Sequence, residues 1–249
     1  MGIGGLSARH FYTSALNTAD FLAEAHPTCT VFVIGESGLT TALHERRIAN
    51  DSIKPDFVVV GEGQSTTDKL TKAHEFIEKG ARLVATNPDN WCPISADRTR
   101  PGAGSTVAFL ESSTGQRAYY LGKPNAYMFH RARKQLLQAF HPNLDQVVMI
   151  GDTMATDIRG AVEAGLLAYL VLSGSTQLEE LQDYVYQPTR VLTTVGDLVG
   201  EIRQGFSANP DVYVAPPTLP VPKRRHVGRR HQTDPLPKTR LRPKAPMTK

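Results

Sequence analysis

Two aspartates around the end of one apolar segment are the strongest chemical signal in the chain. The run Gln146–Ile150 and a glycine lead to Asp152, and Asp157 follows at the start of a segment with helical spacing. The run predicts a buried strand, and open parallel sheets bind ligands at the carboxyl ends of their strands. Thr156 is expected to cap the following helix. Two converging carboxylates suit Mg²⁺, which keeps waters and a phosphate oxygen beside one or two carboxylates. The pattern therefore points to phosphate chemistry.

A lysine is expected at the same place. Lys123 follows the apolar run Ala118–Leu121 and precedes a helix predicted over Asn125–Phe140, with Pro124 suited to the first helical position. Its charge would stabilise the anionic transition state of phosphoryl transfer. The ordinary alternatives are a solvated surface lysine and, for Asp152 and Asp157, a pair of carboxylates that favours a helix N-terminus.

The elements that must position these residues alternate between strand and helix patterns. In the first half, strands are predicted at Thr30–Ile34, Asp56–Val60 and Ala81–Ala85, and helices at Tyr12–Ala25, Leu39–Arg47 and Asp68–Lys79. The order implies a layered α/β domain. Loop-like sequence follows Asn90, and residues 101–105 are interpreted as a turn into a helix rather than a phosphate loop, because they lack the Gly-Lys-Ser/Thr ending.

The second half repeats the alternation. Strands are predicted at 146–150, 167–172 and around Val191, and helices at 125–140, 156–164 and 195–204. This pattern is typical of a parallel sheet with helices on its faces.

Composition excludes several classes of protein. The chain has 249 residues, 40% of them hydrophobic, and no apolar run approaches the ~20 residues that cross a bilayer. Neither a signal peptide nor a disulfide framework is indicated, so we expect a cytoplasmic protein in which Cys29 and Cys92 are reduced packing residues.

The basic charge belongs to one end of the chain. Residues 221–249 hold ten Lys or Arg and one acidic residue, whereas residues 1–220 hold 18 basic and 23 acidic side chains. Prolines are dense there and large apolar residues few, which predicts a disordered tail over 206–249. Because no aromatic residue follows Tyr213, we expect no nucleic-acid partner beyond a weak contact by this tail.

The motifs together resemble a known family. Gly122-Lys123-Pro124 and Gly151–Asp157 resemble the third and fourth motifs of haloacid dehalogenase (HAD) phosphatases. Further segments narrow the resemblance to the NagD-like class, and they occur in the right order: Phe11–Ala15, Thr18–Leu22, Val33–Glu36, Pro55–Glu62, Gly80–Asp89 and Leu170–Gly174. The resemblance covers roughly residues 10–205.

The resemblance implies an α/β fold with a Rossmann-like core and an inserted α/β cap. Residues 1–24 would lead from the core, 25–117 form the cap, 118–205 form the C-terminal half of the core, and 206–249 form the tail. Asp152 and Asp157 would hold Mg²⁺, and Lys123 would orient the nucleophile and bind the substrate. Asn87 and Asp89 would help to select the substrate, although Asn-Pro-Asp is equally an ordinary turn sequence.

One feature of the family is absent from the sequence. The family's first motif is Asp-x-Asp, whose first aspartate attacks phosphorus and whose second is general acid and base, and no Asp-x-Asp occurs among the 249 residues. The leading hypothesis is a phosphomonoesterase acting on small phosphorylated metabolites of nucleotide, sugar phosphate or pyridoxal phosphate type, with a homodimer through the cap. The alternatives are an inactive truncated relative that serves as an interaction or dimerisation module, and a gene start placed too late. An uncovered strand edge predicts self-association.

Overall fold

The computed structural model describes residues 5–95, 97–139 and 147–203. The helices are α1 (Ser14–Ala25), α2 (Ser37–Glu45), α3 (Thr67–Glu78), α4 (Ala103–Thr114), α5 (Ala126–Ala139), α6 (Arg159–Glu163) and α7 (Val199–Arg203), with short helical turns η1 (Ala8–His10), η2 (Met154–Ile158), η3 (Leu178–Asp183) and η4 (Val195–Leu198). The strands are β1 (Thr30–Ile34), β2 (Ala49–Asn50), β3 (Phe57–Val60), β4 (Arg82–Ala85), β5 (Trp91–Ser95), β6 (Arg98–Pro101), β7 (Tyr119–Tyr120), β8 (Val148–Gly151), β9 (Leu167–Val171) and β10 (Arg190–Leu192). The tail predicted to be disordered lies outside the described residues.

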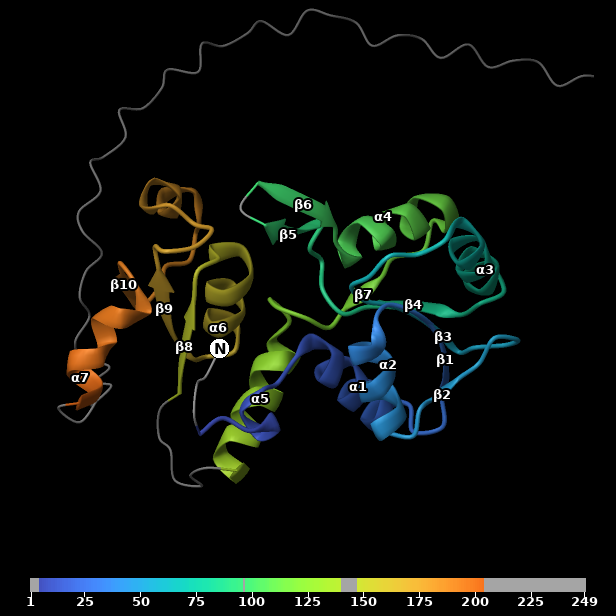
Figure 1. The fold of residues 1–249 in the computed structure, drawn as a ribbon, viewed down its shortest axis with the longest axis horizontal. Helices are drawn as coiled ribbons and strands as arrows, with labels where there is room; N and C mark the ends of the chain where they lie inside the picture. The colour runs from blue at the N-terminus through green and yellow to red at the C-terminus, as the bar shows by residue number, and fades with distance from the viewer. Residues whose placement is uncertain (1–4, 96, 140–146, 204–249) are drawn as a thin grey trace, which may run out of the picture. The chain divides into compact units, whose positions relative to one another are not determined.

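Five parallel strands form the larger sheet (Figure 1). Their order is β2-β1-β3-β4-β7, and Ile34 pairs with Val60, Val60 with Ala85, and Ala85 with Tyr120. Because the strands are parallel and in this register, the loops that follow β1, β3, β4 and β7 all leave from one edge. The residues of those loops are therefore brought together.

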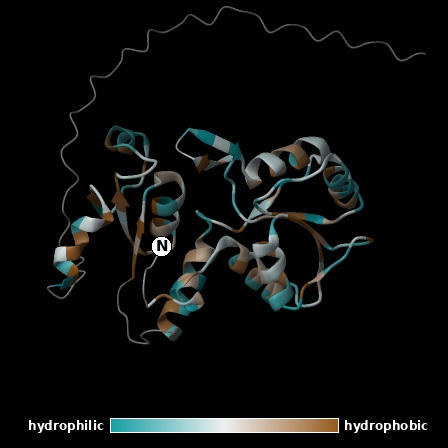
Figure 2. Cartoon of the chain, viewed as in Figure 1, coloured by the Kyte–Doolittle hydropathy of each residue, from teal (hydrophilic) through white to brown (hydrophobic). Residues whose placement is uncertain are grey.

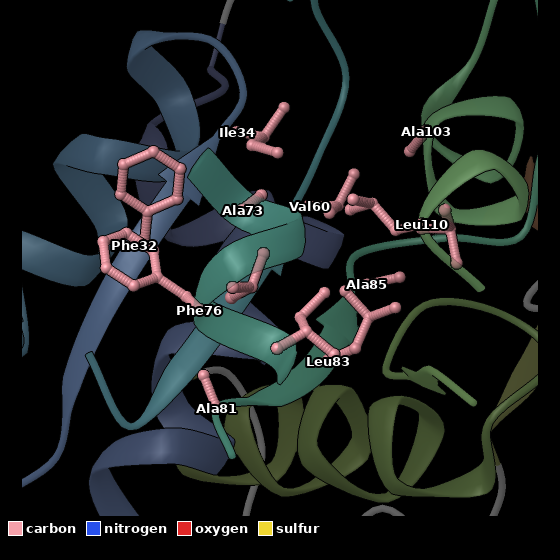
Figure 3. Packing of buried hydrophobic residues seen from close by; sticks show 13 residues of the cluster. Phe32, Ile34, Val60, Ala73, Phe76, Ala81, Leu83, Ala85, Ala103 and Leu110 are labelled. Atoms are coloured by element: carbon pink, nitrogen blue, oxygen red, sulfur yellow. The ribbon is translucent and has the colours of Figure 1, made fainter. Parts of the chain in front are cut away.

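Alternation along each strand builds a core on both faces of this sheet. Phe32, Ile34, Val58 and Val60 point to one face, where α3 and α4 contribute the buried Phe76 and the residues Ala73, Ile77, Ala103, Val107 and Leu110 (Figure 3). Val31, Val33, Val59 and Leu121 point to the other face and pack with Leu22 of α1 and Leu43 of α2. Each fully buried side chain of this size stabilises the fold by about 1.5–3 kcal/mol.

The smaller sheet has three parallel strands in the order β10-β9-β8. Tyr169 of β9 and Leu192 of β10 form a buried cluster with Leu198 of η4, and Figure 2 shows apolar colouring concentrated in the strands. Among the described residues, β8 pairs only with β9, and Ile150 on β8 is 38% exposed.

The predicted α/β class with parallel sheets is confirmed, and the predicted strands and helices occur within a few residues of their expected bounds. The loop expected after Asn90 is a correction, because β5 and β6 form an antiparallel hairpin there. The turn into a helix expected at residues 101–105 is confirmed, since α4 begins at Ala103. Strand β7 joins the larger sheet, and the division of the chain at residue 117 stays a prediction.

Within the described residues, every helix falls short of the length and apolar character needed to span a membrane.

Candidate active site

Asp157 is the most deeply buried charged residue of the candidate site, with 2% of its surface exposed. Its Oδ1 accepts a hydrogen bond from Lys123 Nζ at 2.6 Å, and its Oδ2 accepts from the backbone N–H groups of Asp152 and Thr153 at 3.1 and 3.2 Å. A buried carboxylate is costly unless it is paired and hydrogen-bonded, and this one is both. Asp157 therefore fixes the lysine and the start of the loop after β8 at the same time.

The π-helical turn η2 places the Asp157 carboxylate back beneath the end of β8. Turns of this kind are rare in proteins and are frequent at functional sites. The side chain lies where the Cβ of any residue larger than glycine at position 151 would lie, so Gly151 leaves the space that Asp157 fills. The expected cap by Thr156 is wrong, because Thr156 lies inside η2 and Thr153 precedes the turn.

Lys123 reaches the site from the larger sheet. It follows β7, and Gly122 packs so closely on the backbone carbonyl of Thr86 that a Cβ at position 122 would overlap it. The lysine side chain is 44% exposed, so its ammonium group is paired with Asp157 and still reaches solvent. Pro124 lies two residues before α5, which corrects its expected place in the first helical position. The side chain of Asn125 instead accepts from the N–H of Tyr127.

Asp152 is held by the loop that follows β9. The N–H of Ser175 donates to its Oδ2 at 2.8 Å, and the N–H of Thr176 donates to its backbone carbonyl at 3.0 Å. Partial burial would raise the pKa of Asp152, but hydrogen bonds from the backbone and side chain of Ser175, with the charge of Lys123, lower it below the usual value. Asp152 is therefore an ionised, immobilised carboxylate at the end of a strand.

These residues fit a hard cation in part. Oxygen ligands from one or two carboxylates are what Mg²⁺ accepts from proteins, and Asp152 offers such a group. Asp157 is less free than Asp152 to bind a cation, because both of its carboxylate oxygens already accept hydrogen bonds. Among the residues that the structure describes, no group of three or more His, Cys, Asp or Glu side chains is arranged around one ion. Waters and phosphate oxygens would have to complete the coordination.

Asn87 and Asp89 lie on the loop after β4, which leaves the same sheet edge as Lys123. The Asn87 side chain donates to Glu62 Oε1 at 3.2 Å, and its carbonyl oxygen accepts from the N–H of Asp89 at 3.0 Å. Burial raises the pKa of Asp89, and the charge of Lys123 opposes this shift, whereas Glu62 and Asp157 add to it. The loop is therefore within electrostatic reach of the Lys123–Asp157 pair.

Several contacts were missed by reasoning from the sequence. Ser175 and Thr176 hold Asp152 and the N–H of Met154, but small polar residues after a strand are common and give no signal by themselves. Glu62 and Arg100 meet beside Asn87 although they are distant in sequence. A glutamate two residues after the strand Phe57–Val60 was the one available hint, since it lies at the ligand-binding edge.

Comparison with known proteins shows the family to which the chain belongs. The family model for HAD-hydrolase-like proteins matches residues 120–198. The chain is 40% identical to dihydroxyacetone phosphatase of Corynebacterium glutamicum over 188 residues, which are 75% of this chain and 66% of that protein. It is 33% identical to ribonucleotide monophosphatase NagD of Escherichia coli over 189 residues, 76% of this chain and 72% of NagD.

The solved structure of Escherichia coli NagD superposes with a TM-score of 0.69 at 33% identity, covering 77% of this chain and 74% of NagD. The chain thus resembles these phosphatases both in sequence and in fold. The chain belongs to the HAD superfamily, in its NagD-like class of phosphatases. It spans about two thirds to three quarters of the length of these relatives.

Proposed function

We propose that this chain functions as a Mg²⁺-dependent phosphomonoesterase that acts on small phosphorylated metabolites. The observation that carries the proposal is the 2.6 Å bond between Lys123 and the buried Asp157 beside the ionised Asp152. A fixed cation and a fixed anion within one hydrogen-bonded group suit a phosphate ester and the metal ion that accompanies it. The family to which the chain belongs generally uses a divalent metal ion.

In this proposal the chain's own residues bind and orient the phosphoryl group. Asp157 holds the Lys123 ammonium group in place, so that it faces the phosphoryl oxygens without having to be reorganised during the reaction. Asp152 supplies an anionic oxygen for the cation, which when bound would neutralise charge on the phosphoryl group. No Asp-x-Asp occurs among the 249 residues. In this proposal, Lys123, Asp152 and Asp157 hold the metal ion and the phosphate.

The substrate class rests on the relatives and on the loop after β4. Two of these relatives are named dihydroxyacetone phosphatase and ribonucleotide monophosphatase. We propose a substrate of nucleotide, sugar phosphate or pyridoxal phosphate type, with Asn87 and Asp89 facing its organic part. A cytoplasmic location and a homodimer through residues 25–117 stay predictions.

A phosphatase assay tests the proposal directly. The full chain is incubated with Mg²⁺ and p-nitrophenyl phosphate, beside the Asp152→Ala variant and a sample treated with a chelator. Turnover that both the substitution and the chelator abolish would support the proposal. Absence of turnover by the unsubstituted chain would instead favour the inactive relative that serves as an interaction or dimerisation module.

A further inference from the structure

Glu62 forms a junction at the sheet edge that carries Lys123. It follows β3 and Gly61, and its side chain is 31% exposed. Its two carboxylate oxygens contact three separate segments: the loop after β4, the β5–β6 hairpin and the N-terminus of α4. The phosphatase chemistry proposed above does not explain why an acidic residue at this edge should contact all three segments.

Each oxygen of Glu62 holds a different part. Oε1 accepts from Asn87 Nδ2 and from the N–H of Ala103, both at 3.2 Å. Oε2 accepts from Cys92 Sγ at 3.5 Å and lies 4.0 Å from an Arg100 guanidinium nitrogen. Oε1 therefore ties the loop to α4, and Oε2 ties the hairpin to the sheet.

The loop that Glu62 holds is packed tightly against α4. The N–H of Gly104 donates to the Asp89 carbonyl at 2.8 Å, and the N–H of Gly102 donates to the Asn90 carbonyl at 2.9 Å. A Cβ at either glycine would overlap the backbone of Pro88 or Asp89. Small changes in the position of Ala103 are thus passed to the backbone of Asp89.

Glu36 provides a natural comparison. It follows β1 at the same sheet edge, and its Oε1 accepts from Arg100 Nη1 at 3.0 Å. Its side chain thus contacts the hairpin through Arg100, whereas Asn87 and Ala103 bond to Glu62. Substitution of Glu36 therefore disturbs the hairpin without releasing the loop.

We propose that Glu62 is a positioning residue, which fixes the Asn87–Asp89 loop beside Lys123 so that the loop can contact the organic part of a phosphate ester. The link to substrate rests on the proposed function, whereas the link to the loop rests on the Glu62 contacts alone. Glu62 touches neither the metal ion nor the phosphoryl group in this proposal. Substitution of Glu62 should therefore weaken recognition of the organic part of the ester and leave recognition of phosphate itself unchanged.

The first test measures the loop without any ligand. Amide hydrogen exchange of Gly102 and Gly104 is compared in the full chain and in Glu62→Ala, Glu62→Gln and Glu36→Ala. We expect Glu62→Ala to raise both exchange rates about tenfold. Glu62→Gln retains a carbonyl oxygen for Asn87 and Ala103 and should restore most of the protection. Glu36→Ala should leave it unchanged, and equal effects of the two alanine substitutions would overturn the proposal.

The hairpin gives a second readout. In a Cys29→Ser background, the alkylation rate of Cys92 reports access to its thiol, which bonds to both Glu62 and Arg100. We expect faster alkylation in the variants of Glu62 and of Glu36. If only the Glu36 variant responded, Oε2 of Glu62 would not hold the hairpin.

Ligand binding then connects the loop to substrate. With Mg²⁺ present, calorimetry measures binding of inorganic phosphate and of phenylphosphonate, which carries an organic group and is not hydrolysed. Glu62→Ala should weaken phenylphosphonate binding about tenfold and leave phosphate binding unchanged. Equal weakening of both ligands would overturn the positioning role. Binding of neither ligand by the unsubstituted chain would contradict the proposed function, and the exchange rates would still decide whether Glu62 fixes the loop.

Discussion

Gly174 lies against the carboxylate of Asp152, and a Cβ at this position would overlap it. Gly174→Ala should therefore displace a carboxylate that the Ser175 N–H now holds at 2.8 Å. Substitution of residues that orient a metal ligand typically lowers metal affinity by about 10–100-fold. We therefore expect Gly174→Ala to weaken Mg²⁺ binding by about tenfold or more in a calorimetric titration. Gly200→Ala is the matched control, since a Cβ there meets open space. Unchanged affinity in Gly174→Ala would show that Asp152 is not a ligand.

Asp89 should make the protein's stability depend on pH. Burial raises its pKa in the folded state, so folding favours the protonated carboxyl group. Above the folded pKa, the charged form costs stability, and below the unfolded value of about 3.9 the carboxyl group is neutral in both states. Asp89→Asn should consequently be more stable than the unsubstituted chain at pH 7, and this difference should vanish as the pH falls below about 4.

Urea unfolding followed by circular dichroism from about pH 3 to pH 8 measures this difference. Asp97→Asn is a suitable control, because Asp97 is an exposed residue between β5 and β6, outside the loop that carries Asp89. A difference that grew toward low pH would have the wrong sign for a raised pKa.

At the scale of single residues, the sequence was sufficient for those with unusual chemistry. Lys123 and Asp152 could be predicted to lie together because each follows an apolar run, with Asp157 close behind Asp152. The expected single sheet edge was wrong, because β7 belongs to the larger sheet and β8 to the smaller one. The supports of the site residues could not be predicted. The partners of the Asp152 carboxylate and carbonyl oxygens lie more than twenty residues away, and Glu62 meets Arg100 only because the hairpin folds back over the sheet edge.

Helix α4 gives a sharper test of packing than any single site residue. Gly104 and Gly38 are each the second residue of a helix. Within helix interiors, alanine is better than glycine by about 0.8–1 kcal/mol. At position 104, however, a Cβ would overlap the Pro88 carbonyl, whereas position 38 is open. We expect Gly38→Ala to be neutral or stabilising by up to about 1 kcal/mol, and Gly104→Ala to destabilise by about 1–3 kcal/mol.

Equilibrium urea denaturation of the two variants measures this contrast. Equal free energies of unfolding would mean that the loop after β4 shifts without cost, and the proposed coupling between α4 and Asp89 would lose its basis.

The hairpin was the main element that the sequence pattern did not reveal. Strand β5 contains Pro93, strand β6 carries two arginines, and both strands expose most of their side chains. Proline and charge argue against a central strand but are tolerated in an edge hairpin, so the pattern resembled a loop. The central strands β1, β3 and β4 of the larger sheet were easier to predict, because they are apolar and buried along most of their length. The short strand β2 was not predicted, because both of its residues are exposed.

For the molecule as a whole, the edge of β8 predicts association. Among the described residues this edge lacks a partner, and Ile150 beside it is 38% exposed. Such edges pair readily with other chains unless a charge protects them. We expect sedimentation velocity to show concentration-dependent self-association, and Ile150→Lys to reduce it severalfold.

Val162→Lys on α6 is the control for a change in net charge, because Val162 is similarly exposed on a helix. A monomer at every concentration would contradict the role of this edge.

The close approach of α4 to the loop after β4 has a consequence for how the protein can diversify. Asn90 and Gly102 bracket the hairpin, and they are joined to each other by a hydrogen bond, while Ser105 also donates to the Asn90 carbonyl. The two ends of the hairpin therefore stay together whatever sequence lies between them. We therefore expect that exposed residues of the hairpin other than Cys92 and Arg100 can be exchanged without moving Lys123, Asp152 or Asp157.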